Sequence, residues 1–261
     1  MRPELRKNPL KKKIKAGKPV LGTFLFTPST AMIEILAWAG YEFVIICTEH
    51  FMKNPETVEQ MVVAAEAAGI VPLLRTQENP YLIERGLSVG CRGIMLPMCN
   101  TQEIAHQAIN WAKYAPLGQR GLCMPRAVTY GVGGLTEMSQ FFATENKETQ
   151  LILQIESMEG VNNLDAILDL PGVDMVFAGP LDLSGSLGLP CQMDHPELEK
   201  VLERILQKAK AKKIPVGIAA ADAALTKKRM AQGFDLITIA SDAQFFANGA
   251  KTELDAVKGK V

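Results

Sequence analysis

Runs of apolar residues alternate with amphipathic stretches of helix length along most of this chain. This rhythm predicts repeated βα units and therefore a parallel sheet. The apolar runs predict strands at residues 19–25, 43–47, 70–74, 93–96, 151–156, 174–178, 214–218 and 236–240. Eight such strands in 261 residues match a single (β/α)₈ TIM barrel, whose usual length is roughly 250 residues. We therefore expect one α/β domain over residues 1–261.

The stretches between the strands predict helices, and capping residues mark several of their ends. Ser29 is a suitable N-cap, Pro55 opens a helix and Gly69 ends it. The expected helices lie at residues 4–16, 29–39, 55–69, 80–89, 101–113, 160–168, 196–212 and 243–257. The first of these precedes the first strand and is placed to close the bottom of the barrel.

Two connections differ from the others. Residues 114–147 are rich in Gly and Pro and are too long for an ordinary connection, although residues 135–143 predict a short helix. Such an excursion is usually functional or covers part of the molecule. Residues 179–194 are expected to form a loop. Pro72 is an awkward residue for a central strand, because it cannot donate a hydrogen bond to its neighbour.

Polar residues recur where the predicted strands end, which is where TIM barrels carry their chemistry. These residues are Glu49, His50, Arg75, Gln154, Glu156, Asp182, Ser241 and Asp242. Each has a plainer alternative when taken alone. A carboxylate in this position is often the N-cap of the next helix, and a histidine is often only a hydrogen-bonding residue. Their recurrence at strand after strand predicts an active site at this end of the barrel.

Glu156 and Asp182 follow consecutive predicted strands and could share a hard divalent cation such as Mg²⁺ or Mn²⁺. Such an ion polarises a carbonyl group. Arg75 could stabilise a carboxylate or a developing enolate, and His50 could move a proton near neutral pH. No lysine stands at these exits, which argues against an aldolase that works through a Schiff base. The residues predict proton or carbon–carbon bond chemistry beside a carbonyl.

Composition narrows the class of protein further. Lysine plus arginine and aspartate plus glutamate both number 28, so nothing suggests a nucleic-acid partner. The Lys-rich start (Lys7, Lys11, Lys12, Lys13 and Lys15) is expected to be the solvated face of a short helix. No apolar run is long enough for a membrane span, and no signal peptide is visible. Five cysteines without metal-type spacing favour a reduced, cytoplasmic chain.

Four stretches together resemble the HpcH/HpaI aldolase family. They are residues 45–50 (IICTEH), 74–75 (LR), 154–160 (QIESMEG) and 179–184 (GPLDLS), and residues 95–98 and 120–121 match as well. The resemblance extends from about residue 8 to about residue 248. The family comprises class II pyruvate aldolases of the 2-keto-3-deoxy-sugar-acid and 4-hydroxy-2-oxo-heptanedioate types. It implies a lyase that cleaves a 4-hydroxy-2-oxo acid to pyruvate and an aldehyde through a metal-stabilised pyruvate enolate.

The resemblance also implies roles for individual residues. Glu156 and Asp182 would hold the metal, either Mg²⁺ or Mn²⁺, with Co²⁺ as a further option. Arg75 would contact the ketone oxygen and stabilise the enolate, and His50 would serve in the proton relay.

The same resemblance implies a substrate pocket and an assembly. Gln154 would lie beside the bound 2-oxo acid, and the backbone around Gly179 and Pro180 would hold the pyruvate carboxylate. The chain would form a homohexamer, a trimer of dimers, in which the C-terminal helix is exchanged between subunits.

The chain departs from the family pattern in two places. Cys47 and Thr48 stand where the family usually has Asp-Gly, and the missing aspartate would orient and charge the histidine. After Arg75, residues 76–79 replace the usual proline-rich loop. Three hypotheses remain open at this point: an aldolase with a different proton relay, an oxaloacetate-type decarboxylase that uses the same enolate, or a non-catalytic barrel that binds an oxo acid.

Overall fold

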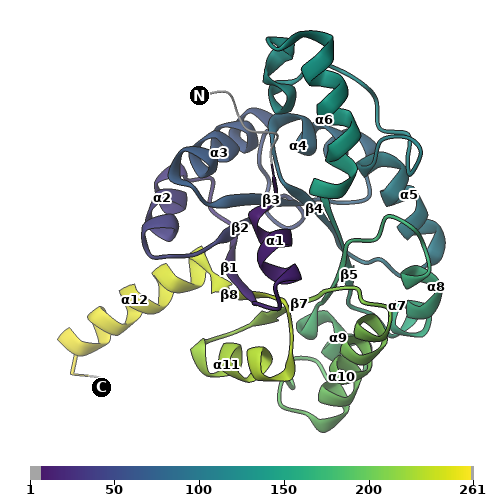
Figure 1. The fold of residues 1–261 in the computed structure, drawn as a ribbon. Coiled ribbons are helices and arrows are strands. Elements are labelled where there is room, and N and C mark those ends of the chain that lie inside the picture. Colours follow the sequence, from purple (N-terminus) through teal and green to yellow (C-terminus); the bar gives the residue numbers. More distant parts are fainter. Residues whose placement is uncertain (1–6, 260–261) are drawn as a thin grey trace.

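Eight parallel strands close into a barrel in the computed structural model, which describes residues 7–259 (Figure 1). Each strand pairs with the next one along the chain, and β1 closes the barrel against β8. The strands are β1 (Val20–Leu25), β2 (Phe43–Cys47), β3 (Val71–Arg75), β4 (Gly93–Leu96), β5 (Gln150–Ile155), β6 (Met175–Ala178), β7 (Val216–Ala220) and β8 (Leu236–Ser241). The predicted TIM barrel is confirmed, and Pro72 lies within β3 in register with Val44.

Helices surround the barrel, as Figure 1 shows. They are α1 (Pro9–Lys15), α2 (Thr30–Trp38), α3 (Pro55–Ala68), α4 (Pro80–Val89), α5 (Gln102–Ala112), the short 3₁₀ helix η1 (Arg126–Gly131), α6 (Gly134–Glu148), α7 (Met158–Asn162), α8 (Leu164–Leu168), α9 (Pro180–Ser186), α10 (Pro196–Ala211), α11 (Ala223–Gln232) and α12 (Asp242–Val257). Helix α1 lies across one end of the barrel, where its buried Leu10 and Ile14 join the interior cluster. The predicted N-terminal helix thus closes the bottom of the barrel over its described residues.

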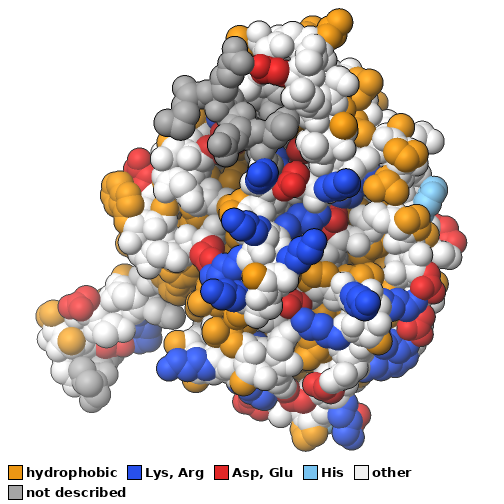
Figure 2. All heavy atoms as spheres, in the orientation of Figure 1, with side chains coloured by type: hydrophobic (Ala, Val, Ile, Leu, Met, Phe, Trp, Pro, Cys, Tyr) orange, Lys and Arg blue, Asp and Glu red, His pale blue; other side chains and the backbone are white. Residues whose placement is uncertain are grey.

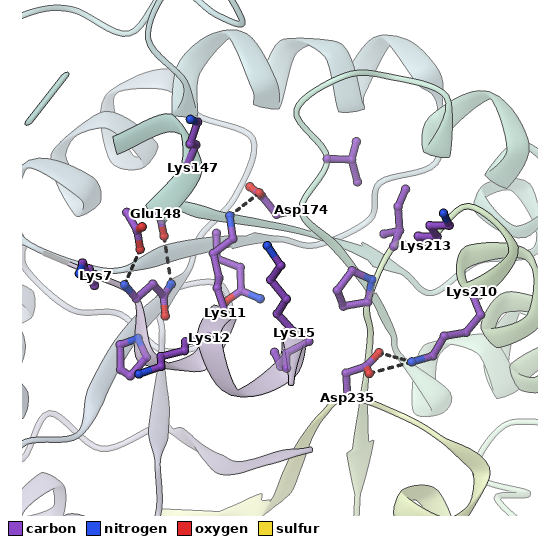
Figure 3. A pocket seen from close by; sticks show the side chains of 17 residues that line it. Lys7, Lys11, Lys12, Lys15, Lys147, Glu148, Asp174, Lys210, Lys213 and Asp235 are labelled. Carbon is purple, nitrogen blue, oxygen red and sulfur yellow. Dashed lines mark hydrogen bonds and ion pairs between the residues drawn. The ribbon is translucent and has the colours of Figure 1, made fainter. Parts of the chain in front are cut away.

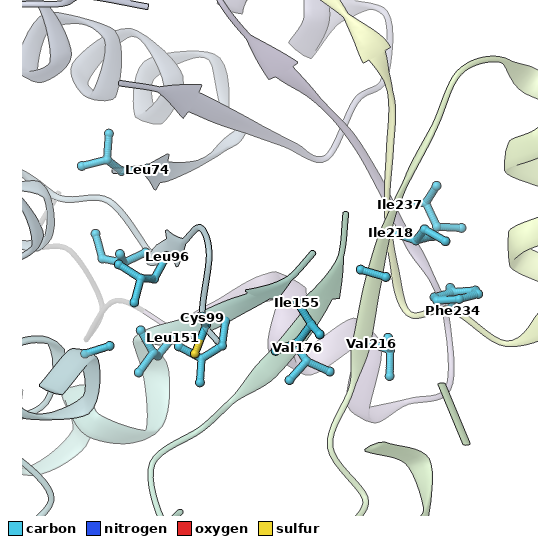
Figure 4. Close-up of a cluster of buried hydrophobic side chains, with 14 of the residues drawn as sticks. Leu74, Leu96, Cys99, Leu151, Ile155, Val176, Val216, Ile218, Phe234 and Ile237 are labelled. Atoms are coloured by element: carbon cyan, nitrogen blue, oxygen red, sulfur yellow. The ribbon is translucent and has the colours of Figure 1, made fainter. Parts of the chain in front are cut away.

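The core has two layers because successive side chains of a strand point to opposite faces. Ile45 and Leu73 point into the barrel, where they pack with Phe177 and other inward side chains. Val44 and Leu74 point outward and pack against the helices. Figure 4 shows part of this outer layer, including Leu74, Ile155 and Val176. The same alternation turns the polar residues at the strand ends toward the mouth of the barrel.

Two segments differ from the predicted elements. Residues 179–194 were expected to be a loop, but α9 occupies the first part of this segment. Pro180 at the start of α9 and Asp182 in its first turn both favour helix initiation. Helix α11 was not among the predicted helices, although Asp222 caps its start and the left-handed Gly233 ends it.

The long excursion lies on the side of the barrel and does not reach across the mouth. Arg126 donates a hydrogen bond of 2.9 Å to the carbonyl of Val89 and pairs with Glu66, so the excursion is tied to α3 and α4. The Asn146 side chain of α6 makes two hydrogen bonds to the backbone of Tyr114. The predicted short helix at residues 135–143 corresponds to the N-terminal part of the longer α6. The excursion is therefore fastened to the helices on this side of the barrel.

Helix α12 leaves the barrel after its first turns and extends away from it (Figure 1). Its outer part carries exposed apolar side chains, including Phe246 (71% exposed) and Val257 (86%). Within residues 7–259, no helix is both long and apolar enough to cross a lipid bilayer. Among residues 7–259, nothing covers these apolar side chains of α12.

Candidate active site

Glu156 stands at the carboxyl end of β5 and is buried, with 3% of its surface exposed. Its Oε1 accepts a hydrogen bond of 2.7 Å from the backbone N–H of Met98. Its Oε2 accepts a second hydrogen bond from the side-chain amide of Gln154. The two side chains lie on the same face of the strand, as the alternation of residues in a strand predicts. Two directed donors therefore fix the orientation of this carboxylate.

Gly179 provides the space that Glu156 and Gln154 occupy. A Cβ atom at Gly179 would lie 2.7 Å from both Cβ and Oε2 of Glu156, and 3.1 Å from Nε2 of Gln154. The two separations from Glu156 are shorter than packed atoms allow, and the separation from Gln154 is unusually tight. Glycine at this position therefore lets the end of β6 approach the end of β5 closely.

Replacing Gly179 with alanine should lower the rate of a reaction at this site by roughly 10- to 100-fold, because the Glu156 carboxylate must move to avoid the new methyl group. The backbone of Gly179 has φ −98°, so the alanine itself causes no backbone strain. Steady-state kinetics and a metal titration measure the effect. The matched control is Gly185→Ala in α9, where an added Cβ meets no atom within 4 Å. An unchanged rate and metal affinity in Gly179→Ala would show that the close approach is unimportant.

Burial raises the pKa of Glu156 to about 7. The Met98 hydrogen bond opposes this shift, whereas the charges of Asp182 and Glu49 add to it and that of Arg75 opposes it. The ionised carboxylate is therefore disfavoured in the chain by itself. A bound cation would remove this penalty.

Asp182 lies in the first turn of α9, is exposed, and has its charge close enough to influence Glu156. Within the described residues, no group of three or more His, Cys, Asp and Glu side chains is arranged to hold a metal. A hard cation such as Mg²⁺ needs only one or two carboxylates, since waters and substrate oxygens complete its shell. The buried Oε1 of Gln154 has no hydrogen-bond partner and adds a further oxygen at the site. The residues present therefore fit a divalent cation.

Arg75 is buried at the end of β3 and is held on three sides. Its Nη2 donates a hydrogen bond of 3.2 Å to Sγ of Cys47. Its Nε lies 3.1 Å from Oε2 of Glu49 in an ion pair that is not aligned as a hydrogen bond. Its guanidinium carbon lies 4.5 Å from the centre of the Phe24 ring. These contacts hold the Arg75 guanidinium in place near Glu156. Its ion pair with Glu49 is not reinforced by a hydrogen bond.

His50 lies at the rim of the mouth, with 60% of its side chain exposed. Its Nε2 is 3.5 Å from Oε2 of Glu49, the same oxygen that pairs with Arg75. Cys47, by contrast, is buried and directs its sulfur to Arg75. Glu49 therefore supplies the carboxylate neighbour of His50 in this chain.

The backbone at Gly179 and Pro180 forms a wall of the site. The N–H of Gly179 donates a hydrogen bond of 3.1 Å to the carbonyl of Ile155, and Pro180 has no N–H. Neither residue can therefore donate a backbone hydrogen bond to an anion in this arrangement. Leu181 and Asp182 come next, in the first turn of a helix, where N–H groups have no partner within the helix.

The last two polar residues at strand exits serve the backbone. Asp242 accepts hydrogen bonds from the N–H groups of Phe26 (2.8 Å) and Thr27 (2.9 Å), and Ser241 caps α12. Nearby, Lys53 donates to the carbonyls of Phe26 (2.8 Å) and Cys47 (2.7 Å). These contacts hold the loop that carries Glu49 and His50 against the rim of the barrel.

Three contributors to the site were not predicted: Glu49 as the shared carboxylate, Phe24 under Arg75, and the N–H of Met98. Glu49 was noticed only as a polar residue at a strand exit. The position of Phe24 near the end of β1, on the inward face, is what could have indicated its place in the site. The role of the Met98 N–H could not be predicted from the sequence, because it depends on the left-handed backbone conformation at Met98 (φ 51°).

Known proteins resemble this chain over nearly its whole length. Residues 21–249 match the family described as HpcH/HpaI aldolase/citrate lyase. The 2-keto-3-deoxy-L-rhamnonate aldolase of Klebsiella pneumoniae subsp. pneumoniae is 32% identical over 257 residues, which cover 97% of this chain and 94% of that protein. The protein of the same description from Salmonella paratyphi B is 31% identical with the same coverage.

Solved structures give the same result. An HpcH/HpaI aldolase/citrate lyase family protein from Burkholderia cenocepacia J2315 is 31% identical, with a TM-score of 0.89 over 97% of this chain and all of that one. The citrate synthase SbnG is 30% identical, with a TM-score of 0.84 over 96% of this chain and 98% of that one. The barrel and these matches define a metal-dependent carbon–carbon lyase of the class II aldolase type, which acts on small molecules. The chain belongs to the HpcH/HpaI aldolase/citrate lyase family, as its sequence motifs predict.

Proposed function

We propose that this chain cleaves a 4-hydroxy-2-oxo acid of the 2-keto-3-deoxy-sugar-acid type to pyruvate and an aldehyde. The observation that carries the proposal is the oriented, buried carboxylate of Glu156, which lies within the electrostatic reach of Asp182, Glu49 and Arg75. The relatives described as 2-keto-3-deoxy-L-rhamnonate aldolases support this choice of substrate class.

In this proposal, Glu156 and Asp182 hold a divalent cation, either Mg²⁺ or Mn²⁺, and Gln154 lies beside the 2-oxo acid. When bound, the cation supplies a Lewis acid for the ketone. The hydrogen bonds to Glu156 from Met98 and Gln154 keep its carboxylate in one orientation. The Gly179–Pro180 wall confines the carboxylate end of the substrate, and the following amides of α9 are the nearest candidate donors.

Arg75 is assigned to the ketone oxygen, where negative charge develops as the carbon–carbon bond breaks. Its guanidinium is already oriented by Cys47, Glu49 and Phe24, so little reorganisation accompanies the reaction. A preoriented donor of this kind favours the enolate over the ground-state ketone.

His50 is assigned to proton transfer at the hydroxyl on C4. The His50 imidazole, or a water held by it, takes the hydroxyl proton while the C3–C4 bond breaks to give the aldehyde and the enolate. The enolate then takes a proton at C3 to give pyruvate. Glu49, 3.5 Å from Nε2, stabilises the protonated ring during this exchange. Glu49 immediately precedes His50 in the sequence, so the histidine has a carboxylate neighbour although Cys47 stands in place of the family aspartate.

The assembly and the compartment also belong to this proposal. The exposed Phe246 and Val257 of α12 are the kind of surface that exchange of this helix between subunits of a hexamer would cover. All five cysteines are free, which supports a reducing, cytoplasmic setting.

The test follows pyruvate release from 2-keto-3-deoxy-L-rhamnonate, 4-hydroxy-2-oxo-heptanedioate and oxaloacetate, with chelator-treated protein before and after addition of Mg²⁺ or Mn²⁺. We expect cleavage of a hydroxy-oxo acid that is lost on chelation and restored by metal. Faster release from oxaloacetate than from either hydroxy-oxo acid would replace the proposal with a decarboxylase. Pyruvate binding without any turnover would indicate a binding protein.

A further inference from the structure

A large hollow lies at the end of the barrel opposite to the candidate active site. It has a volume of about 1020 Å³ and is formed by α1, the end of α6 and the segments that lead into β5, β6, β7 and β8. Figure 3 shows its side chains, which include Lys12 and Lys15 from α1 and Lys147 from α6. We call this space the basal hollow. It is separated from Glu156 and Arg75 by the packed interior of the barrel.

Positive charge dominates the lining of the basal hollow. Seven lysines and three carboxylates line it, an excess of four positive charges in a chain whose net charge is zero. The lysines are Lys7, Lys11, Lys12, Lys15, Lys147, Lys210 and Lys213. In the space-filling view, blue side chains gather over and around α1 (Figure 2). The excess of positive charge is therefore a local property of the basal hollow.

The three carboxylates are already engaged by the protein. Asp174 pairs with Lys11 and with the buried Lys113, and it accepts a hydrogen bond from the N–H of Leu151. Asp235 binds Lys210 through both oxygens at 2.7 Å and also accepts from the N–H of Val216.

Glu148, the third carboxylate, accepts a hydrogen bond of 2.6 Å from the N–H of Asn8. Asp174 and Asp235 are thus paired with lysines and Glu148 is held by the backbone, so the three carboxylates tie the walls together while the lining keeps its excess of positive charge.

The remaining lysines have no carboxylate partner within residues 7–259. They are Lys7, Lys12, Lys15, Lys147 and Lys213, and three separate segments of the chain bring them together. On α1, Lys12 and Lys15 are three residues apart, a spacing that makes their side chains neighbours on the helix surface. A concave surface lined by one sign of charge concentrates ions of the opposite sign. The Lys-rich start is exposed at Lys7, Lys12 and Lys15, as expected of a solvated face, and these same side chains line the basal hollow.

We propose that the basal hollow binds a small polyanion with three or more negative charges, such as a triphosphate or a tricarboxylate. Lysine ammonium groups bind phosphate and carboxylate oxygens as point charges, and several of them can converge on one such ligand. The hollow is as large as a sizeable small-molecule pocket. Because α1 plugs the barrel with Leu10 and Ile14, the ligand would join the plug to α6 and to the segment before β7, and so stabilise the fold.

The test is isothermal titration calorimetry on metal-free protein, with inorganic tripolyphosphate in one arm and citrate in the other. Removing metal ensures that neither probe binds through a cation at the opposite end. We expect one site per chain for at least one probe, with an affinity that falls steeply as salt is raised. The variant Lys12→Glu with Lys15→Glu should lose at least about tenfold in affinity, since each reversal turns an attraction into a repulsion. The two arms tell phosphate from carboxylate chemistry.

The matched control is Lys227→Glu with Lys258→Glu, which changes the net charge equally at exposed positions outside the hollow. Equal losses in both variants, or no binding of either probe to the natural chain, would overturn the proposal. Acetylation footprinting of the natural chain gives a second measurement that does not depend on the variants. Tripolyphosphate or citrate should protect Lys12, Lys15 and Lys213 but not Lys227, and uniform protection would contradict a defined site.

Discussion

Glu156→Gln should lower metal-dependent cleavage by at least about a thousandfold, and it should also stabilise the metal-free protein at pH 8. The loss of activity follows because an amide is a poor ligand for a hard cation, and the Lewis acid contributes several kcal/mol to the reaction. Pyruvate release and metal titration measure it. The variant should fold, because the Gln154 side-chain amide can rotate by half a turn. Oε1 of Gln154, which has no partner in the natural chain, can then accept a hydrogen bond from the new NH₂ group at position 156.

The gain in stability follows from the raised pKa of Glu156. A carboxyl group whose pKa rises from 4.5 to about 7 on folding binds more protons in the folded chain than in the unfolded one between these two values. The free energy of unfolding therefore falls as pH rises through this window, by up to about 3 kcal/mol, and stays lower above it. A glutamine at position 156 carries no charge, so the variant does not undergo this fall in the free energy of unfolding. Thermal unfolding with chelator should show a higher Tm for the variant at pH 8 and no difference near pH 4, where the carboxyl is neutral in both states.

The matched control for this prediction is Glu159→Gln, three residues further along the chain, where the carboxylate is exposed. It should leave both the rate and the melting temperature unchanged. A Glu156→Gln variant that keeps its metal-dependent rate would remove Glu156 from the metal site. Equal stability of the variant and the natural chain at pH 8 would mean that burial does not disfavour the Glu156 charge.

The strand pattern was sufficient to predict the barrel, because each apolar run is bounded by turn residues and followed by a helical stretch. It was also sufficient to place Gln154 and Glu156 side by side, since the alternation of side chains in a strand is fixed by backbone geometry. Helix α9 was not predicted because Gly185 and Gly188 give its segment the composition of a loop. Pro180 and Asp182 do favour helix initiation at its start.

Which groups face one another across the mouth was harder to predict from sequence. The change from aspartate to Cys47 was expected to deprive His50 of a carboxylate neighbour. In the folded chain, the Cys47 sulfur lies against Arg75, and Glu49 is the neighbour of both Arg75 and His50. These pairings depend on the turn after β2 and on the hydrogen bonds from Lys53 that hold this turn in place. No local sequence pattern predicts these long-range contacts. His50 therefore keeps a carboxylate neighbour in this structure, although Cys47 cannot provide one.

Arg75→Lys should lower kcat/KM for cleavage of the hydroxy-oxo acid by roughly 100- to 1000-fold, although it keeps the positive charge. The natural guanidinium carbon lies 4.5 Å from the centre of the Phe24 ring, with Nη2 on Cys47 and Nε beside Glu49, so its remaining donors point in fixed directions. A lysine ammonium cannot make these contacts together and would be drawn toward Glu49, away from the developing enolate oxygen. Most of the loss should appear in kcat, because the interaction strengthens only as the enolate forms. Arg85→Lys on the exposed side of α4 is the matched control and should retain the natural rate. A loss confined to KM would instead place Arg75 at the substrate carboxylate, where it would bind the ground state and the transition state equally.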